Sequence, residues 1–176
     1  MIKTFGFGLL ALLLIPLFVA CTPGVGYEAG IYTQSVHGTL KGVGEEVPFI
    51  VVITQEETFM SQPGQPVYRT KARLAKVNKK GEYVITLSDA DRSVQLHSLA
   101  KGYQLDQKEF SRTLGVKSYK YNITLSPSKN WGPEFTLHLK PFLMGFILDD
   151  RYQMPKGDQL FLGDWMQEME KEITIP

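Results

Sequence analysis

Short segments in which apolar and polar residues alternate, separated by turn residues, run through most of this chain of 176 residues. Alternation with a period of two is typical of β-strands that bury one face. It is clearest in residues 82–88, where Tyr83, Ile85 and Leu87 fall on one face. The same reasoning predicts strands at residues 31–40, 47–55, 67–77, 93–99 and 117–126, two strand-like pieces around Pro141 in residues 134–148, and a last short strand at 158–163.

Turn residues separate nearly all of these segments, which favours many short strands. The sequence NKKG at 78–81 predicts a hairpin turn, in which Gly81 tolerates a positive φ. Strands at this spacing predict an all-β fold: a two-sheet antiparallel β-sandwich, transthyretin-like or immunoglobulin-like. We expect residues 31–176 to form this sandwich as a single domain.

The end of the chain has a helical period instead. Four apolar side chains share one face of residues 164–173: Trp165, Met166, Met169 and Ile173. Asp164, with Gln167 three residues later, resembles a capping box and marks the expected start of the helix. Ten residues make a marginal helix on their own, so we expect it to dock on the sandwich. The alternative is that Trp165, Met166 and Met169 bind a partner.

The first residues differ from the rest of the chain. Lys3 precedes an almost wholly apolar run at residues 5–18. A charged residue followed by roughly 14 apolar ones is typical of a secretory signal, and the run is short of the ~20 residues that span a bilayer. We expect residues 1–20 to be a signal peptide that is removed, with a retained anchor helix as the alternative.

Cys21, the single cysteine of the chain, follows this run directly in the sequence FVAC. FVAC resembles the lipobox of bacterial lipoproteins, in which small Ala20 precedes the modified cysteine. The resemblance implies that the chain is cut before Cys21, that the thiol receives a diacylglyceryl group, and that the new amino terminus is acylated. Two or more acyl chains hold a protein stably on a membrane. Thr22 stands where an aspartate commonly signals inner-membrane retention, which implies the outer membrane, facing the periplasm, if the organism is Gram-negative.

Cleavage before Cys21 leaves about 156 residues, enough for one domain with a core. Without Lys3, the mature chain carries 18 basic and 18 acidic residues, a balance that gives no electrostatic reason to bind nucleic acid. Residues 21–30 form a lipidated terminus and a Gly/Pro-rich spacer. The nine residues after Cys21 reach at most ~30 Å, so the domain should lie close to the membrane.

Residues 67–125 contain three stretches, NKKGEYVITL, AKGYQL and YKYNITL, that resemble transthyretin-like domains, especially the carboxypeptidase regulatory-like branch. The resemblance implies a small sandwich that serves as a structural, adhesive or interaction module. It implies no catalytic residues.

Candidate chemistry is sparse. His37, His97 and His138 each fall in a strand-like segment, and three histidines on adjacent strands are a weak candidate for zinc. Independent histidines on solvated faces are the alternative, and we expect no metal and no cofactor. The carboxylate pairs Asp89/Asp91 and Asp149/Asp150 fit turns, the second with Arg151 as an internal partner.

Trp131 lies in the polar sequence SPSKNWGP, which predicts a loop. A tryptophan there is able to stack on a sugar ring or anchor a protein contact, or it caps the edge of the core.

Together these features predict a non-catalytic, lipid-anchored envelope protein that binds or assembles with a protein partner. The rivals are a periplasmic ligand-binding, inhibitor or immunity-type module, and an unrecognised hydrolase or metal enzyme.

Overall fold

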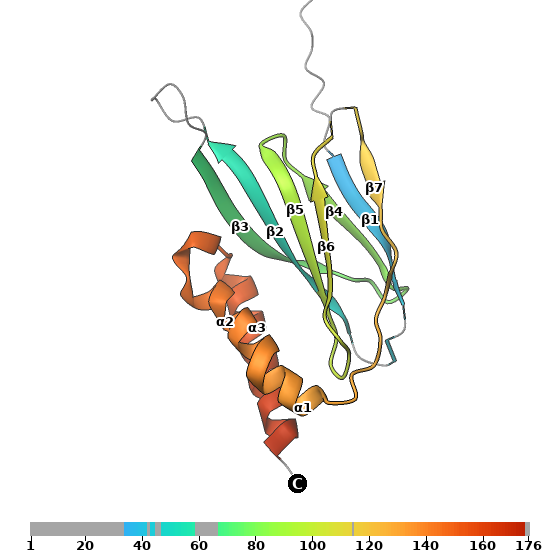
Figure 1. Ribbon diagram of the computed structural model, residues 1–176, viewed down its shortest axis with the longest axis vertical. Helices are drawn as coiled ribbons and strands as arrows, with labels where there is room; N and C mark the ends of the chain where they lie inside the picture. Colours follow the sequence, from blue (N-terminus) through green and yellow to red (C-terminus); the bar gives the residue numbers. More distant parts are fainter. Residues whose placement is uncertain (1–33, 42, 45–46, 59–66, 114, 175–176) are drawn as a thin grey trace, which may run out of the picture. The chain divides into compact units, whose positions relative to one another are not determined.

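The computed structural model describes residues 34–41, 43–44, 47–58, 67–113 and 115–174, all within one compact unit, Ile31–Pro176 (Figure 1). Cys21, the leader and the spacer lie outside the described residues. The described strands are β1 (Gln34–Lys41), β2 (Phe49–Thr58), β3 (Val67–Lys76), β4 (Glu82–Leu87), β5 (Asp91–Leu99), β6 (Asp106–Ser111), β7 (Ser118–Lys120) and β8 (Ile123–Thr124). The helical segments are α1 (Trp131–Glu134), the π-helix η1 (Phe135–Leu139), α2 (Lys140–Leu148), the 3-10 turn η2 (Asp150–Tyr152) and α3 (Lys156–Thr174).

These strands form two sheets, which confirms the predicted β-sandwich with a C-terminal helix. One sheet has the order β4-β1-β7, with β8 also paired to β1, and the other has the order β3-β2-β5-β6. β1 pairs β7 and β8 in parallel, whereas the remaining pairings are antiparallel. Strand β6 was not predicted, because most of its side chains are polar and exposed.

The NKKG turn is present, but the predicted hairpin is wrong. Gly81 has a φ of +78°, and its N–H donates to the carbonyl of Asn78 over 2.8 Å. The strands before and after the turn belong to different sheets, β3 in one and β4 in the other. A local pattern predicts a turn but not the pairing of its flanking strands.

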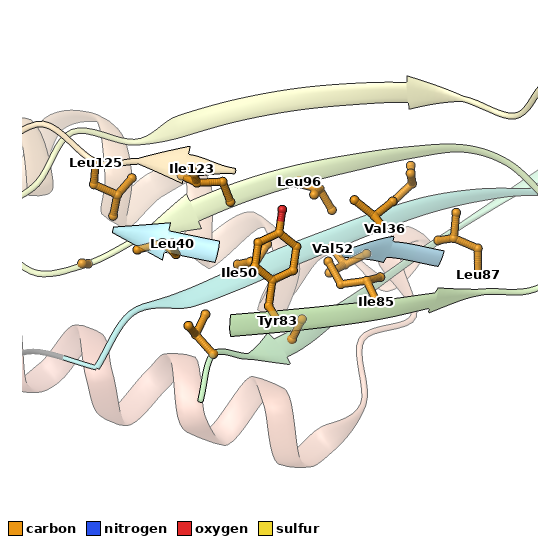
Figure 2. Close-up of a cluster of buried hydrophobic side chains, with 14 residues drawn as sticks. Val36, Leu40, Ile50, Val52, Tyr83, Ile85, Leu87, Leu96, Ile123 and Leu125 are labelled. Atoms are coloured by element: carbon orange, nitrogen blue, oxygen red, sulfur yellow. The ribbon is translucent and has the colours of Figure 1, made fainter. Parts of the chain in front are cut away.

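The core between the sheets consists of alternate side chains from both (Figure 2). Its labelled members are Val36, Leu40, Ile50, Val52, Tyr83, Ile85, Leu87, Leu96, Ile123 and Leu125. The Tyr83 hydroxyl donates to the carbonyl of Tyr121 over 2.6 Å, and the Tyr121 hydroxyl donates to Asp106 over 2.8 Å. Burial and the hydrogen bond to Asp106 raise the pKa of Tyr121 to about 12.

Strand β2 is buried on both faces over its first six residues. Ile50 and Val52 belong to the core between the sheets, whereas Phe49, Val51 and Ile53 belong to a second core with the helices. The helical segments therefore form a third layer over the β3-β2-β5-β6 sheet (Figure 1).

Residues 134–148 and 158–163 are helical, so the strands predicted there are wrong. Four side chains at spacings of four, four and three bury one helical face: Phe135, Leu139, Leu143 and Phe146. Pro141 does not divide two strands but lies in the first turn of α2, directly after the π-helix η1.

α3 contains the predicted helix 164–173 but begins eight residues earlier, so the predicted capping box at Asp164 and Gln167 is wrong. An acidic residue of its first turn, Asp158, accepts the backbone N–H of Leu74 on edge strand β3 over 2.9 Å. An ion pair between Lys140 and Glu170 joins α2 to α3. Within the described residues, no helix combines the length and apolar character needed to cross a membrane.

Replacing Gly38 with alanine should lower the free energy of unfolding by about 1–3 kcal/mol. A Cβ at Gly38 would lie 1.7 Å from the carbonyl oxygen of Tyr121. The backbone of Tyr121 is held in place, because its N–H donates to the carbonyl of His37 over 2.9 Å. β1 and the segment after β7 must therefore move apart. Urea unfolding measures the loss. Gly163→Ala in α3, which meets no atom within 4 Å, is the control and should stabilise the protein; a neutral Gly38→Ala would contradict the packing described.

Candidate functional site

A cavity of about 470 Å³ opens between the segment that joins β5 to β6 and the helical layer. Its lining residues are Tyr103, Gln104, Leu105, Gln107, Trp131, Glu134, His138, Leu139 and Phe142. We call it the Trp131 cavity. It combines residues from two segments about 30 positions apart in the chain, each of which supplies both apolar and polar side chains.

Trp131 begins α1, so the prediction that it lies in a loop is wrong by one residue at the helix boundary. Its ring lies 5.7 Å from that of Phe135 and 6.4 Å from that of Trp165, and it is partly buried against the second core. Trp131 therefore both covers the edge of that core and lines the cavity. The core-capping alternative therefore describes one side of the ring, and binding at the cavity stays a prediction.

Hydrogen bonds hold polar residues of the cavity lining in place. Glu134 accepts the hydroxyl hydrogen of Ser128 over 2.5 Å. The N–H of Gln104 donates to the carbonyl of Ser126 over 2.9 Å, and the N–H of Ser128 donates to the carbonyl of Gly102 over 2.8 Å. The two backbone bonds join the β5–β6 segment to the chain that leads into α1.

The π-helix η1 positions the remaining groups. Its last N–H bond runs from Lys140 to the carbonyl of Phe135, five residues back. Phe135 points into the second core, whereas His138 is exposed and Leu139 reaches the cavity. Single π turns within helices are frequent at functional sites.

His97 lies behind the cavity wall. Its ring is 4.9 Å from that of Phe142, which lines the cavity, and His97 pairs across the sheet with Gln107, which also lines it. His97 is 7 % exposed, and neither ring nitrogen has a hydrogen-bond partner. Burial lowers the pKa of His97, because the charged ring loses its hydration.

The free energy of unfolding should therefore fall as the pH drops below about 6.5. The unfolded chain takes up a proton at the ordinary histidine pKa, and the folded chain does so only at a lower pH, so protons favour unfolding in between. Urea unfolding at pH 7.5 and pH 5.5 measures this loss. His97→Leu should make the loss smaller, whereas His138→Gln, at an exposed position, should leave it as it is. An equal loss of unfolding free energy in the wild type and in His97→Leu would show that His97 is not the source of this pH dependence.

The three histidines do not meet at one site. His37 is on β1 in the other sheet, His97 is on β5, and His138 is in η1 rather than in the predicted strand. Among the residues that the structure describes, no group of three or more histidine, cysteine or acidic side chains is arranged to hold a metal.

Of the residues predicted on the C-terminal helix, Met166 and Met169 are buried in the second core. Trp165 is partly buried, with its ring 5.1 Å from that of Phe49 on β2. These three residues therefore dock α3 on the sheet, as the first alternative predicted. Met166 also reaches a groove of about 640 Å³ between α2 and α3.

The carboxylate pairs serve turns, as predicted. The Asp91 side chain accepts the N–H of Ser88 over 2.7 Å. Asp149 caps η2 and accepts hydrogen bonds from two guanidinium nitrogens of Arg151, from Nε to Oδ1 over 2.9 Å and from Nη2 to Oδ2 over 2.5 Å. The hydrogen bonds from Arg151 lower the pKa of Asp149.

Sequence reasoning singled out Trp131, and named His138 only as a weak metal candidate, but missed the other lining residues. Gln104, Gln107 and Glu134 have no motif, and only the fold brings them to one cavity. The available signal was the helical spacing that places Glu134 and His138 four residues apart, close to Trp131.

No protein-family model matches the chain, and no curated protein matches it. Among solved structures, the chain is similar to the crystal structure of chlorocatechol 1,2-dioxygenase from Pseudomonas putida, with 12% sequence identity and a TM-score of 0.28. The match covers 53% of this chain and 60% of that one.

Proposed function

We propose that this protein is a lipid-anchored component of a bacterial cell envelope, held in the outer membrane and facing the periplasm. It acts without catalysis as a binding or assembly module. One observation carries the proposal: the apolar run at residues 5–18 ends at the single cysteine, Cys21. Acyl chains on Cys21 would contribute ~0.8 kcal/mol per buried methylene to membrane binding.

The helical layer supports a role in binding a protein partner. Of the large apolar side chains that are exposed among the described residues, five lie on it: Leu137, Leu148, Leu160, Phe161 and Ile173. Leu160 also lines the groove between α2 and α3, together with Met144 and Ile147. An apolar groove bordered by polar residues, such as this one, is typical of a protein contact site. The short spacer would keep the domain close to the membrane, where a partner is also confined.

Crosslinking in intact membranes, followed by affinity capture, tests the proposal. The wild type is compared with an exported chain that carries Cys21→Ser behind a cleavable leader of a soluble protein. We expect the wild type to recover a specific membrane partner and the untethered form to recover at least about tenfold less, because tethering raises the local concentration. Equal recovery by both forms would argue against assembly through the tether.

A second candidate function, a ligand-binding module, is favoured by the Trp131 cavity. Its volume of about 470 Å³ lies within the range of small-molecule sites, ~300–1,000 Å³.

A further inference from the structure

We propose that the Trp131 cavity binds one ring of an uncharged sugar. The inference goes beyond the proposed function and does not depend on the lipid at Cys21. It rests on the mixed chemistry of the cavity lining and on the hydrogen bonds that hold its wall in place.

Four residues of the cavity lining are apolar or aromatic: Trp131, Leu105, Leu139 and Phe142. The Trp131 ring is fixed by a tilted contact with the Phe135 ring and an edge contact with the Trp165 ring, so it is held in place before any ligand arrives. A flat, partly exposed indole suits the C–H face of a sugar ring, which is apolar although its edge is polar.

Polar residues of the same lining offer groups that match hydroxyls. Gln104 and Gln107 each carry an amide with two donors and an acceptor, and both are exposed. Glu134 adds a carboxylate that is oriented by Ser128, and it has further lone pairs free to accept. His138 adds an imidazole.

Charge narrows the ligand class. The lining residues given above include Glu134 but no lysine or arginine, so an anionic ligand would meet a negative charge without a positive one. A wholly apolar ligand would remove Gln104, Gln107 and Glu134 from water without replacing their hydrogen bonds. An uncharged polyhydroxyl ring with one apolar face would contact the apolar lining residues and form hydrogen bonds with the polar ones.

Hydrogen bonds and an ion pair hold the wall of the cavity in place. The backbone bonds between Gln104 and Ser126 and between Ser128 and Gly102 join the β5–β6 segment to the chain that leads into α1. The Tyr103 hydroxyl accepts the N–H of Gly44 over 3.2 Å. An ion pair between Lys101 and Glu172 ties the same turn to α3. A preformed wall lowers the entropy lost on binding.

Tryptophan fluorescence tests the proposal, because the chain has two tryptophans and Trp165→Phe leaves Trp131 as the single reporter. The full-length chain is kept in a polyoxyethylene detergent, which has no sugar headgroup. The probes are the trisaccharide of N-acetylglucosamine and maltotriose, with tetramethylammonium chloride and benzoate for comparison. We expect a saturable change in Trp131 emission with at least one trisaccharide, at a Kd below ~1 mM.

Variants locate the site. Gln107→Leu should weaken sugar binding at least tenfold, and Glu109→Leu, two residues further on the same exposed edge strand but outside the cavity, should not. Calorimetry with Trp131→Leu should show lost binding, and Gln107→Leu carries the test if that variant fails to fold. The proposal is overturned if neither trisaccharide saturates the signal, if Gln107→Leu binds as the parent does, or if the ammonium or benzoate probe binds more tightly than the sugars.

Discussion

Truncation of Phe135 to alanine is expected to lower the free energy of unfolding by about 3–5 kcal/mol. Phe135 is wholly buried at the centre of the helical layer, with its ring 5.9 Å from that of Trp165. Its removal leaves a cavity between η1 and α3 and withdraws the support of Trp131. Since small domains are stable by only ~5–15 kcal/mol, a large share of the total is lost.

Urea unfolding of the protein, monitored by circular dichroism, measures this change in the free energy of unfolding. Leu137→Ala is the matched control, because Leu137 lies two residues further in the same π-helix and is 66% exposed. We expect a change within about 0.5 kcal/mol for the control. Similar losses for both variants would mean that the helical layer does not dock through Phe135.

Exchange of residues 1–21 for a cleavable leader of a soluble exported protein is expected to move the chain from the membrane fraction to the soluble periplasmic fraction. The wild type should remain with membranes after a high-salt wash, because acyl chains are held by the hydrophobic effect rather than by charge. Immunoblots of the two fractions measure the shift. If the exchanged chain stays with the membranes, then the folded domain binds there by itself and the tether is not what holds it.

The strands that the sequence predicted well are those with local alternation. In residues 82–88, Tyr83, Ile85 and Leu87 are buried and their neighbours exposed, as the period of two requires. The partners of each strand were beyond such reasoning. β1 lies between β4 and the parallel strands β7 and β8, and nothing local to β1 encodes strands some 80 residues away.

The helical segments η1 and α2 were missed because two periods coexist in residues 134–148. Phe135, Leu137 and Leu139 alternate as in a strand, but the buried set continues from Leu139 to Leu143, four residues later. The unbroken apolar run of β2 was a second signal. A strand with no polar face is typically covered on both sides, which implies a layer beyond the second sheet.

The Trp131 cavity was predictable only in part. A tryptophan among polar residues drew attention to residue 131, and the structure places it both on the core and at the cavity. Gln104 and Gln107 carry no such mark, because their role depends on the β5–β6 turn meeting α1 and η1. Sites assembled from separate segments depend on tertiary packing that local patterns do not encode.

The mass of the N-terminal peptide of the protein purified from membranes tests the lipid tether most directly. The account predicts that the chain starts at Cys21 and carries the added mass of a diacylglyceryl group and an acyl chain. An unmodified sulfur at Cys21, or a peptide that still contains residues 1–20, would contradict it.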